Sequence, residues 1–160
     1  MKGEVDEVRI HVDAPRQAVW DMVTDIRRMG EWSPECYRTE WLDGATPPAV
    51  GARFRGHNRQ RWLRWSVPAR ITAYEPPSRF AFTTAQLGTD LNRWTYRFSD
   101  APGGGTDVVE TCEGLDDLLY LKLVYRTILR DRRETRVAGM QATLQRIKQA
   151  AEAQVPAHQS

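Results

Sequence analysis

The sequence has too few cysteines and histidines for a fold built on metal ions or disulfides. Its 160 residues include 2 cysteines and 3 histidines. Cys36 and Cys112 lack the close spacing of zinc ligands, and His11 and His57 complete no recognisable ligand set with them. No dinucleotide-binding fingerprint is present either. We therefore predict reduced cysteines, no bound metal and no nucleotide cofactor.

The sequence also lacks a long apolar run and an excess of charge of one sign. The apolar stretch at residues 118–121 ends at Lys122, and the first eight residues have no apolar core of the kind found in a secretory signal. The 23 basic and 21 acidic residues leave a net charge of +2, which gives no general attraction to nucleic acid or to a membrane surface. We expect a single cytoplasmic domain over residues 1–154, no membrane span, and a disordered tail over 155–160.

The clearest element that is present is a long amphipathic helix near the C-terminus, over residues 131–153. Its apolar residues recur at steps of three and four, and they are Val137, Met140, Leu144, Ile147 and Ala151. A helix of this length with one apolar face needs a surface to cover. We predict that this surface is a curved sheet and that Val137, Met140, Leu144 and Ile147 are buried against it.

Alternating apolar and polar residues predict a first strand around residues 8–12 and six more strands between residues 37 and 112. Pro15 and the breaks at Gly30 and Pro34 indicate two short helices after the first strand. A hairpin turn is expected at residues 58–61, and Pro68 within the next strand indicates an edge position or a bulge. Residues 114–130 suggest helical turns. The predicted fold class is α+β, with about seven antiparallel strands wrapped around the C-terminal helix.

Several segments carry a resemblance to a known superfamily through their order and spacing. They are DAPRQAVWDMVTDIRRMGEWSPEC (13–36), GARFRG (51–56), WSVPARITAYEPPSRFAF (65–82), W-x-Y-x-F (94–98), GGT (104–106), VxET (108–111) and GMQATLQRIKQAAE (139–152). Together they resemble the START-like helix-grip superfamily (SRPBCC), in particular its polyketide cyclase/dehydrase-like branch from actinobacteria. The resemblance implies a helix-grip fold with a cavity for a hydrophobic or aromatic small molecule. It does not choose a reaction, because members include carriers, cyclases, aromatases and domains without assigned chemistry.

Aromatic residues on the strands are predicted to line such a cavity, while small residues on the helix leave it open. The predicted ligand-binding residues are Trp65, Phe82, Trp94, Tyr96, Phe98, Gly139 and Thr143. The alternative is a solid aromatic core, which the same pattern describes equally well.

Three polar residues are candidates for chemistry in the cavity. Glu110 on an inward face would have a raised pKa and could transfer protons, although we favour the alternative of a solvated carboxylate on the outer face. His57 could transfer protons and Arg64 could hold a carboxylate or enolate oxygen, because both flank the expected hairpin. The alternative for both is an ordinary surface position.

Three classes of function follow from these observations. The leading hypothesis is the binding of a polyketide- or lipid-like hydrophobic molecule by a monomer or homodimer. The enzymatic alternative is a polyketide cyclase, aromatase or dehydratase with acid–base groups in the cavity, and the third is a protein-interaction module with a collapsed core. Arginines near Trp62 and Trp65 could also contact single-stranded nucleic acid, but the near-neutral charge and the outward parity of a half-solvated sheet argue against that partner.

Overall fold

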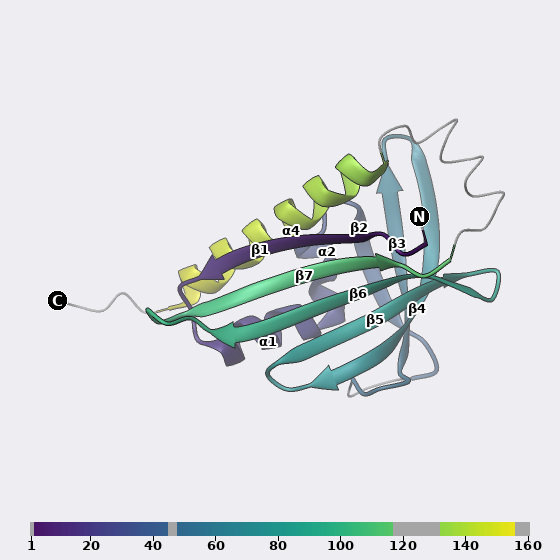
Figure 1. Cartoon of the computed structure of the whole chain (residues 1–160). Helices are drawn as coiled ribbons and strands as arrows, with labels where there is room; N and C mark the ends of the chain where they lie inside the picture. The colour runs from purple at the N-terminus through teal and green to yellow at the C-terminus, as the bar shows by residue number, and fades with distance from the viewer. Residues whose placement is uncertain (1, 45–47, 117–131, 156–160) are drawn as a thin grey trace.

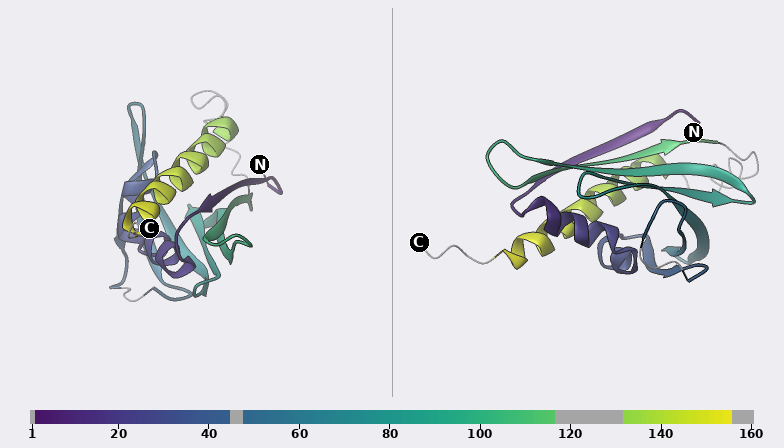
Figure 2. Two further views of the ribbon diagram at one scale, coloured as in Figure 1. Left: turned by 90° about the vertical axis from the view of Figure 1, so that its left-hand side faces the viewer. Right: turned by 90° about the horizontal axis from the view of Figure 1, so that it is seen from below.

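The computed structural model, which describes residues 2–44, 48–116 and 132–155, consists of a curved antiparallel sheet with helices on one side (Figures 1 and 2). The elements in chain order are β1 (Val5–Val12), α1 (Arg16–Thr24), the 3-10 turn η1 (Ile26–Arg28), α2 (Met29–Trp32), β2 (Cys36–Trp41), β3 (Arg53–Gln60), β4 (Leu63–Glu75), β5 (Arg79–Gln86), β6 (Thr89–Asp100), β7 (Thr106–Gly114) and α4 (Arg132–Gln154). The predicted α+β helix-grip architecture is confirmed.

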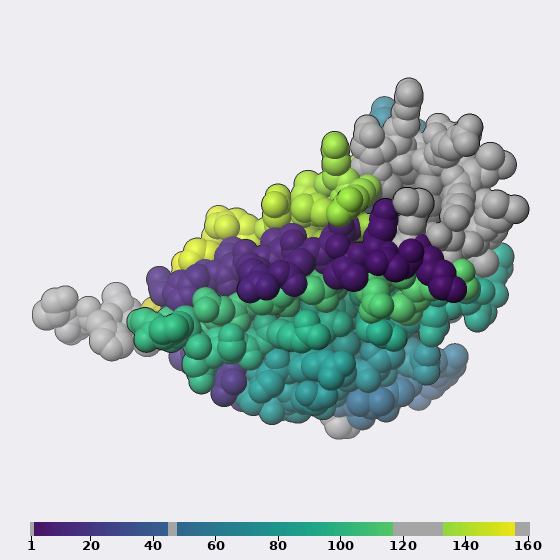
Figure 3. Space-filling model, in the orientation of Figure 1, coloured from purple at the N-terminus to yellow at the C-terminus, as the bar shows by residue number. Residues whose placement is uncertain are grey.

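The seven strands form one sheet in the order β1-β7-β6-β5-β4-β3-β2, and each adjacent pair is antiparallel. Figure 2 shows α1 and α4 beneath the strands, and α4 packs against β1, α1 and α2. Figure 3 shows the opposite face, on which β1, β7 and β6 carry no helix. Most of the large apolar side chains of the strands therefore face the helices, while Asp6 and Glu110 are polar strand residues that are also buried.

The β3–β4 hairpin extends further than the sequence pattern predicts. β3 continues to Gln60 and β4 begins at Leu63, so the turn is at residues 61–62 and not at 58–61. Ladder hydrogen bonds come from the backbone, so the polar residues at the end of β3 can still pair with β4. Pro68 lies in an interior strand, but the pairing of β4 with β5 begins at Ala69, so Pro68 has a strand partner on one side only.

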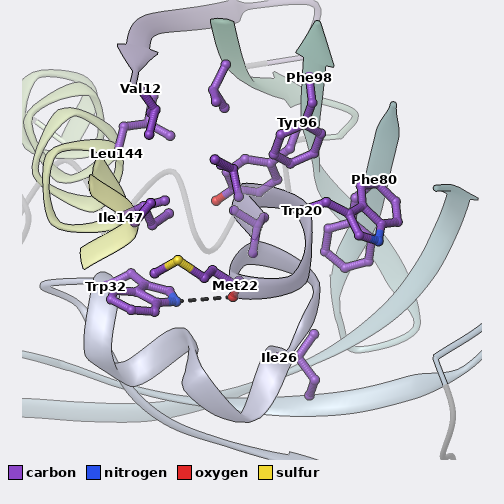
Figure 4. Close-up of a cluster of buried hydrophobic side chains, with 14 of the residues drawn as sticks. Val12, Trp20, Met22, Ile26, Trp32, Phe80, Tyr96, Phe98, Leu144 and Ile147 are labelled. Carbon is purple, nitrogen blue, oxygen red and sulfur yellow. Dashed lines mark hydrogen bonds between the residues drawn. The ribbon is translucent and has the colours of Figure 1, made fainter. Parts of the chain in front are cut away.

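One end of the space between sheet and helices is filled by α1. Pro15 precedes this helix, and Trp20 on its buried face contacts Phe98 edge-to-face with ring centroids 5.5 Å apart. Figure 4 shows this cluster, in which the indole N–H of Trp32 donates to the backbone carbonyl of Met22 at 3.3 Å. Edge-to-face aromatic packing of this kind leaves this end of the core solid.

The helix α4 buries the predicted apolar stripe with one exception. Met140, Leu144, Ile147 and Ala151 are at most 2% exposed, whereas Val137, nearer the start of the helix, is only half-buried. The prediction that Val137 is fully buried is wrong, because the core cluster that α4 joins begins further along the helix, at Leu144.

Two predictions fall wholly or largely outside the described residues, namely the helical turns over 114–130 and the tail over 155–160. Within the ranges that the structure describes, no helix combines the length and apolar character needed to cross a membrane.

Candidate functional site

A cavity of about 740 Å³ lies between the sheet and the first half of α4. This volume is within the range of small-molecule sites, about 300–1,000 Å³. The cavity exists because α1 fills only one end of the space under the sheet, while the other end is spanned by α4 and the connection from α2 to β2. The structure therefore does not have the collapsed core that the interaction-module hypothesis requires.

The wall of the cavity is mainly apolar and partly aromatic. Its apolar members include Phe54, Trp65, Val67, Phe82, Trp94 and Met140. Phe82 and Trp94, on neighbouring strands, have nearly parallel rings at 17° with centroids 6.4 Å apart, and Phe54 meets Phe82 edge-on at 5.3 Å. These rings give the cavity an aromatic wall against which an apolar molecule can pack.

The rim of the cavity is basic. Its exposed residues include Arg59, Arg61 and Arg64 from the β3–β4 hairpin and Thr135 from the start of α4, and they mark where the cavity meets solvent. Arg59 also lies over the ring of Tyr37, with its guanidinium carbon 5.4 Å from the ring centroid.

Arg136 is the basic residue of the inner wall, and its charge is matched by a buried carboxylate. Its Nε donates to Asp6 Oδ2 at 2.7 Å, and the Arg133 Nε donates to Oδ1 of the same residue at 2.8 Å. Burial alone would raise the Asp6 pKa, but the hydrogen bonds and charges of the two arginines hold that pKa below its usual value. Asp6 thus stays ionised and links β1 to α4 beside the cavity.

The buried polar centre of the cavity is a pair formed by Tyr96 on β6 and Glu110 on β7. These residues are cross-strand partners, and the Tyr96 hydroxyl donates to Glu110 Oε1 at 2.7 Å. Glu110 is 2% exposed and Tyr96 is 6% exposed. The second carboxyl oxygen, Glu110 Oε2, has no hydrogen-bond partner among the residues that the structure describes.

Burial controls the protonation of this pair. It raises the pKa of Glu110 to about 8, although the hydrogen bond from Tyr96 acts in the opposite direction. Burial, together with the neighbouring Glu110, raises the pKa of Tyr96 well above its usual value. At neutral pH, Glu110 is therefore a carboxylic acid and Tyr96 a phenol, which makes the site uncharged and leaves Glu110 poised near physiological pH.

Six of the seven predicted ligand-binding residues line the cavity. They are Trp65, Phe82, Trp94, Tyr96, Gly139 and Thr143. The Thr143 hydroxyl donates to the Gly139 carbonyl at 2.9 Å, so its hydrogen is already used within the helix. The seventh residue, Phe98, belongs to the filled end of the core, because Trp20 of α1 packs against it.

The three polar candidates have different positions. Arg64 lies at the rim, while Glu110 lines the interior, so the favoured interpretation of Glu110 as a solvated outer carboxylate is wrong. His57 is on the opposite face of β3 from Phe54 and Gly56, because strand side chains alternate. Its ring bonds outside the cavity to Ser66 Oγ at 2.8 Å and to Glu40 Oε1 at 3.1 Å.

Sequence reasoning missed Cys36 and Arg136 as parts of the cavity wall. A lone thiol and an arginine on a helix carry no local signal of a cavity, and the Asp6–Arg136 pair joins residues 130 positions apart. Burial raises the pKa of the Cys36 thiol to about 11, so it is not a nucleophile at neutral pH. Within the described part of the chain, no three His, Cys, Asp or Glu side chains are arranged to hold a metal ion.

The chain is similar to one described family over most of its length. A family model described as polyketide cyclase / dehydrase and lipid transport matches residues 6–152. No curated protein matches the chain.

Several solved structures share the fold. The Polyketide_cyc-like protein Cgl2372 from Corynebacterium glutamicum is 26% identical, with a TM-score of 0.66 over 99% of this chain and 97% of its own. The AHSA1-like protein from Aeromonas hydrophila is 20% identical, with a TM-score of 0.63 over 94% of this chain and 93% of its own. Protein Ms6760 from Mycobacterium smegmatis is 17% identical, with a TM-score of 0.66 over 94% and 92%.

Proposed function

Because this chain belongs to the polyketide cyclase / dehydrase and lipid transport family, within the SRPBCC superfamily, we propose that it binds a small hydrophobic or aromatic molecule of polyketide- or lipid-like character. The observation that carries the proposal is the cavity of about 740 Å³ with its aromatic wall. Removing a planar apolar ligand from water into this space supplies the driving force, since burying about 250 Å² of apolar surface is worth roughly 6 kcal/mol before the costs of association.

A second candidate function is acid–base catalysis on a bound polyketide-like substrate, as in a cyclase or dehydratase. The observation that favours it is Glu110, whose pKa of about 8 matches the operating range of a general acid or base. Turnover of a bound compound that is lost in Glu110→Gln while binding persists would support this function. Equal turnover in that variant would exclude Glu110 from the chemistry.

Binding is tested by a thermal-shift screen of aromatic and polyketide-like compounds. A compound present at about 100 times its Kd stabilises the folded state by about 2.7 kcal/mol, which corresponds to a rise in Tm of about 5–10 °C for a chain of this size. We expect compounds of this class to produce such shifts with the wild-type protein.

A plugged cavity provides the control. Gly139→Phe would place a ring in the cavity, whereas Gly139→Ala adds only a Cβ at an ordinary 3.7 Å from Pro34 Cγ. We expect the phenylalanine variant to lose the shift and the alanine variant to keep it. Thr143→Phe is a second plug if the first variant has a low Tm without ligand. A wild-type protein that no apolar compound stabilises would contradict the proposed function.

A further inference from the structure

We infer that the buried end of the cavity receives a neutral hydrogen-bond acceptor of the ligand, such as a ketone carbonyl, and that Glu110 donates to it through Oε2. This inference rests on the proposed binding function and specifies the class of ligand. It assigns a donor role to the carboxyl group at the buried end of a mainly apolar cavity.

The geometry of the carboxyl group carries the inference. One oxygen, Oε1, accepts the Tyr96 hydroxyl at 2.7 Å, while the other, Oε2, is buried and has no partner among the described residues. Glu110 contributes to the cavity wall. A buried polar group without a partner destabilises the site, so a ligand that pairs with Oε2 gains more than an apolar molecule of the same shape.

The chemistry of the pair decides between a ligand acceptor and a ligand donor. The Tyr96 phenol has its hydrogen directed at Oε1, so the proton of the neutral carboxyl group resides on Oε2. A protonated Oε2 donates, and its complement is a lone pair on the ligand. The low polarity of the surrounding wall keeps the acid neutral below pH 8 and strengthens the hydrogen bond.

Other ionisable groups near the cavity do not reproduce this behaviour. On α4, Arg136 is paired with Asp6, and on β2 the pKa of the Cys36 thiol is about 11. The remaining ionisable groups of the wall are Glu35 beside β2 and Arg59, Arg61 and Arg64 at the rim, and Cys112 is the next buried residue after Glu110 on the same face of β7. Arginine does not titrate below pH 10, and a Cys112→Ala variant controls for the second thiol.

The test compares two uncharged probes of the same shape, 2-acetylnaphthalene and 2-isopropenylnaphthalene, which carry a carbonyl oxygen and a methylene group at the same position. Their Kd values are measured by calorimetry with the wild-type protein. At pH 6.5 we expect the ketone to bind about three- to tenfold more tightly, the effect of one neutral hydrogen bond. At pH 9.5 the preference should disappear, because ionised Glu110 has no proton to donate.

Two variants separate the donor from the shape of the site. In Glu110→Gln, the amide oxygen can still accept from Tyr96 and the amide N–H can donate, so we expect a ketone preference that is equal at pH 6.5 and 9.5. In Glu110→Leu, the preference should be absent at both values. The carbonyl stretching frequency of bound 2-acetylnaphthalene gives an independent readout, and it should be lower in wild type and Glu110→Gln than in Glu110→Leu.

The outcomes distinguish this inference from the proposed function. Equal, pH-independent binding of both probes by wild type would overturn the donor role of Glu110 and leave hydrophobic binding intact. Failure of both probes to bind wild type, in a screen in which no other apolar compound binds, would overturn both. A pH-dependent preference that survives in Glu110→Gln but vanishes in Cys112→Ala would assign the titration to the thiol and also overturn the inference.

Discussion

Glu110 shows how one side chain can link the stability of the fold to the chemistry of its cavity. Its strand neighbours on the inward face, Val108 and Cys112, are fully buried, and the carboxyl group shares their environment. Keeping an acid there requires the protonated form, because an unpaired buried carboxylate is strongly disfavoured. The hydrogen bond from Tyr96 compensates for part of the lost hydration.

Replacing Glu110 with glutamine should therefore remove a pH dependence of stability. The unfolded chain releases this proton near pH 4.5 and the folded chain near pH 8, so folding stability falls as pH rises between these values and then levels off. The full effect is about 4–5 kcal/mol. We expect the advantage of Glu110→Gln over wild type in urea unfolding to grow from pH 5 to pH 9, whereas parallel profiles would show that Glu110 is ionised in the folded state.

At the scale of elements, α4 is held by a narrow apolar stripe. Leu144 is 1% exposed and belongs to the same core cluster as Ile147 and Val12. The helix has solvent on its other side, so few other contacts can replace this stripe.

We expect Leu144→Ala to lower the free energy of unfolding by about 2–5 kcal/mol, because it removes buried contacts and leaves a cavity. The adjacent Gln145 is exposed, and Gln145→Ala should change the free energy by less than about 0.5 kcal/mol. Chemical denaturation of the two variants measures the difference. Similar midpoints would mean that α4 does not depend on this stripe.

The elements that follow a strong local period were predictable from the sequence. The 3- and 4-residue steps of α4 and the alternation around Trp94 and Tyr96 identified both elements, because side chains on a period of 3.6 or 2 share a face. The end of β3 was not predictable from the sequence, because its pairing with β4 continues through polar residues. The strand ends at a turn in which Arg61 adopts a φ of 56°. No glycine or asparagine marks that turn.

The candidate site was predictable in its aromatic wall but not in its polar centre. The residue before Glu110 and the residue two before it are both valine, so the apolar pattern fits either face of β7. The choice depends on the pairing of β7 with β6, which brings Glu110 opposite Tyr96, and such long-range pairing leaves no local signal.

At the scale of the whole molecule, an ionic contact joins the first strand to the last helix. Asp6, whose side chain is 1% exposed, accepts hydrogen bonds from Arg133 and Arg136. Because β1 is an edge strand of the sheet, this contact attaches that edge of the sheet to α4.

Asp6→Asn should lower stability at neutral pH by about 1–3 kcal/mol, because the charge-assisted hydrogen bonds are lost. The lowered pKa of Asp6 means that this contribution is present above its usual pKa of 3.8 and disappears as pH falls further. Wild type and variant should therefore converge in acid. Glu7→Gln, at an exposed pair with Arg9, is the matched control and should change little. A constant difference down to pH 2 would contradict the ionic role.

The distribution of tryptophans gives the molecule a built-in optical reporter. Trp65 and Trp94 stand in the cavity wall, Trp20 and Trp32 are buried, Trp41 is half-buried, and Trp62 at the hairpin tip is 75% exposed. A quenching ligand would reach the two wall indoles first, while Trp62 contributes red-shifted emission from water. Replacing Trp62 with phenylalanine would make the remaining fluorescence a more direct measure of whether the cavity is full or empty.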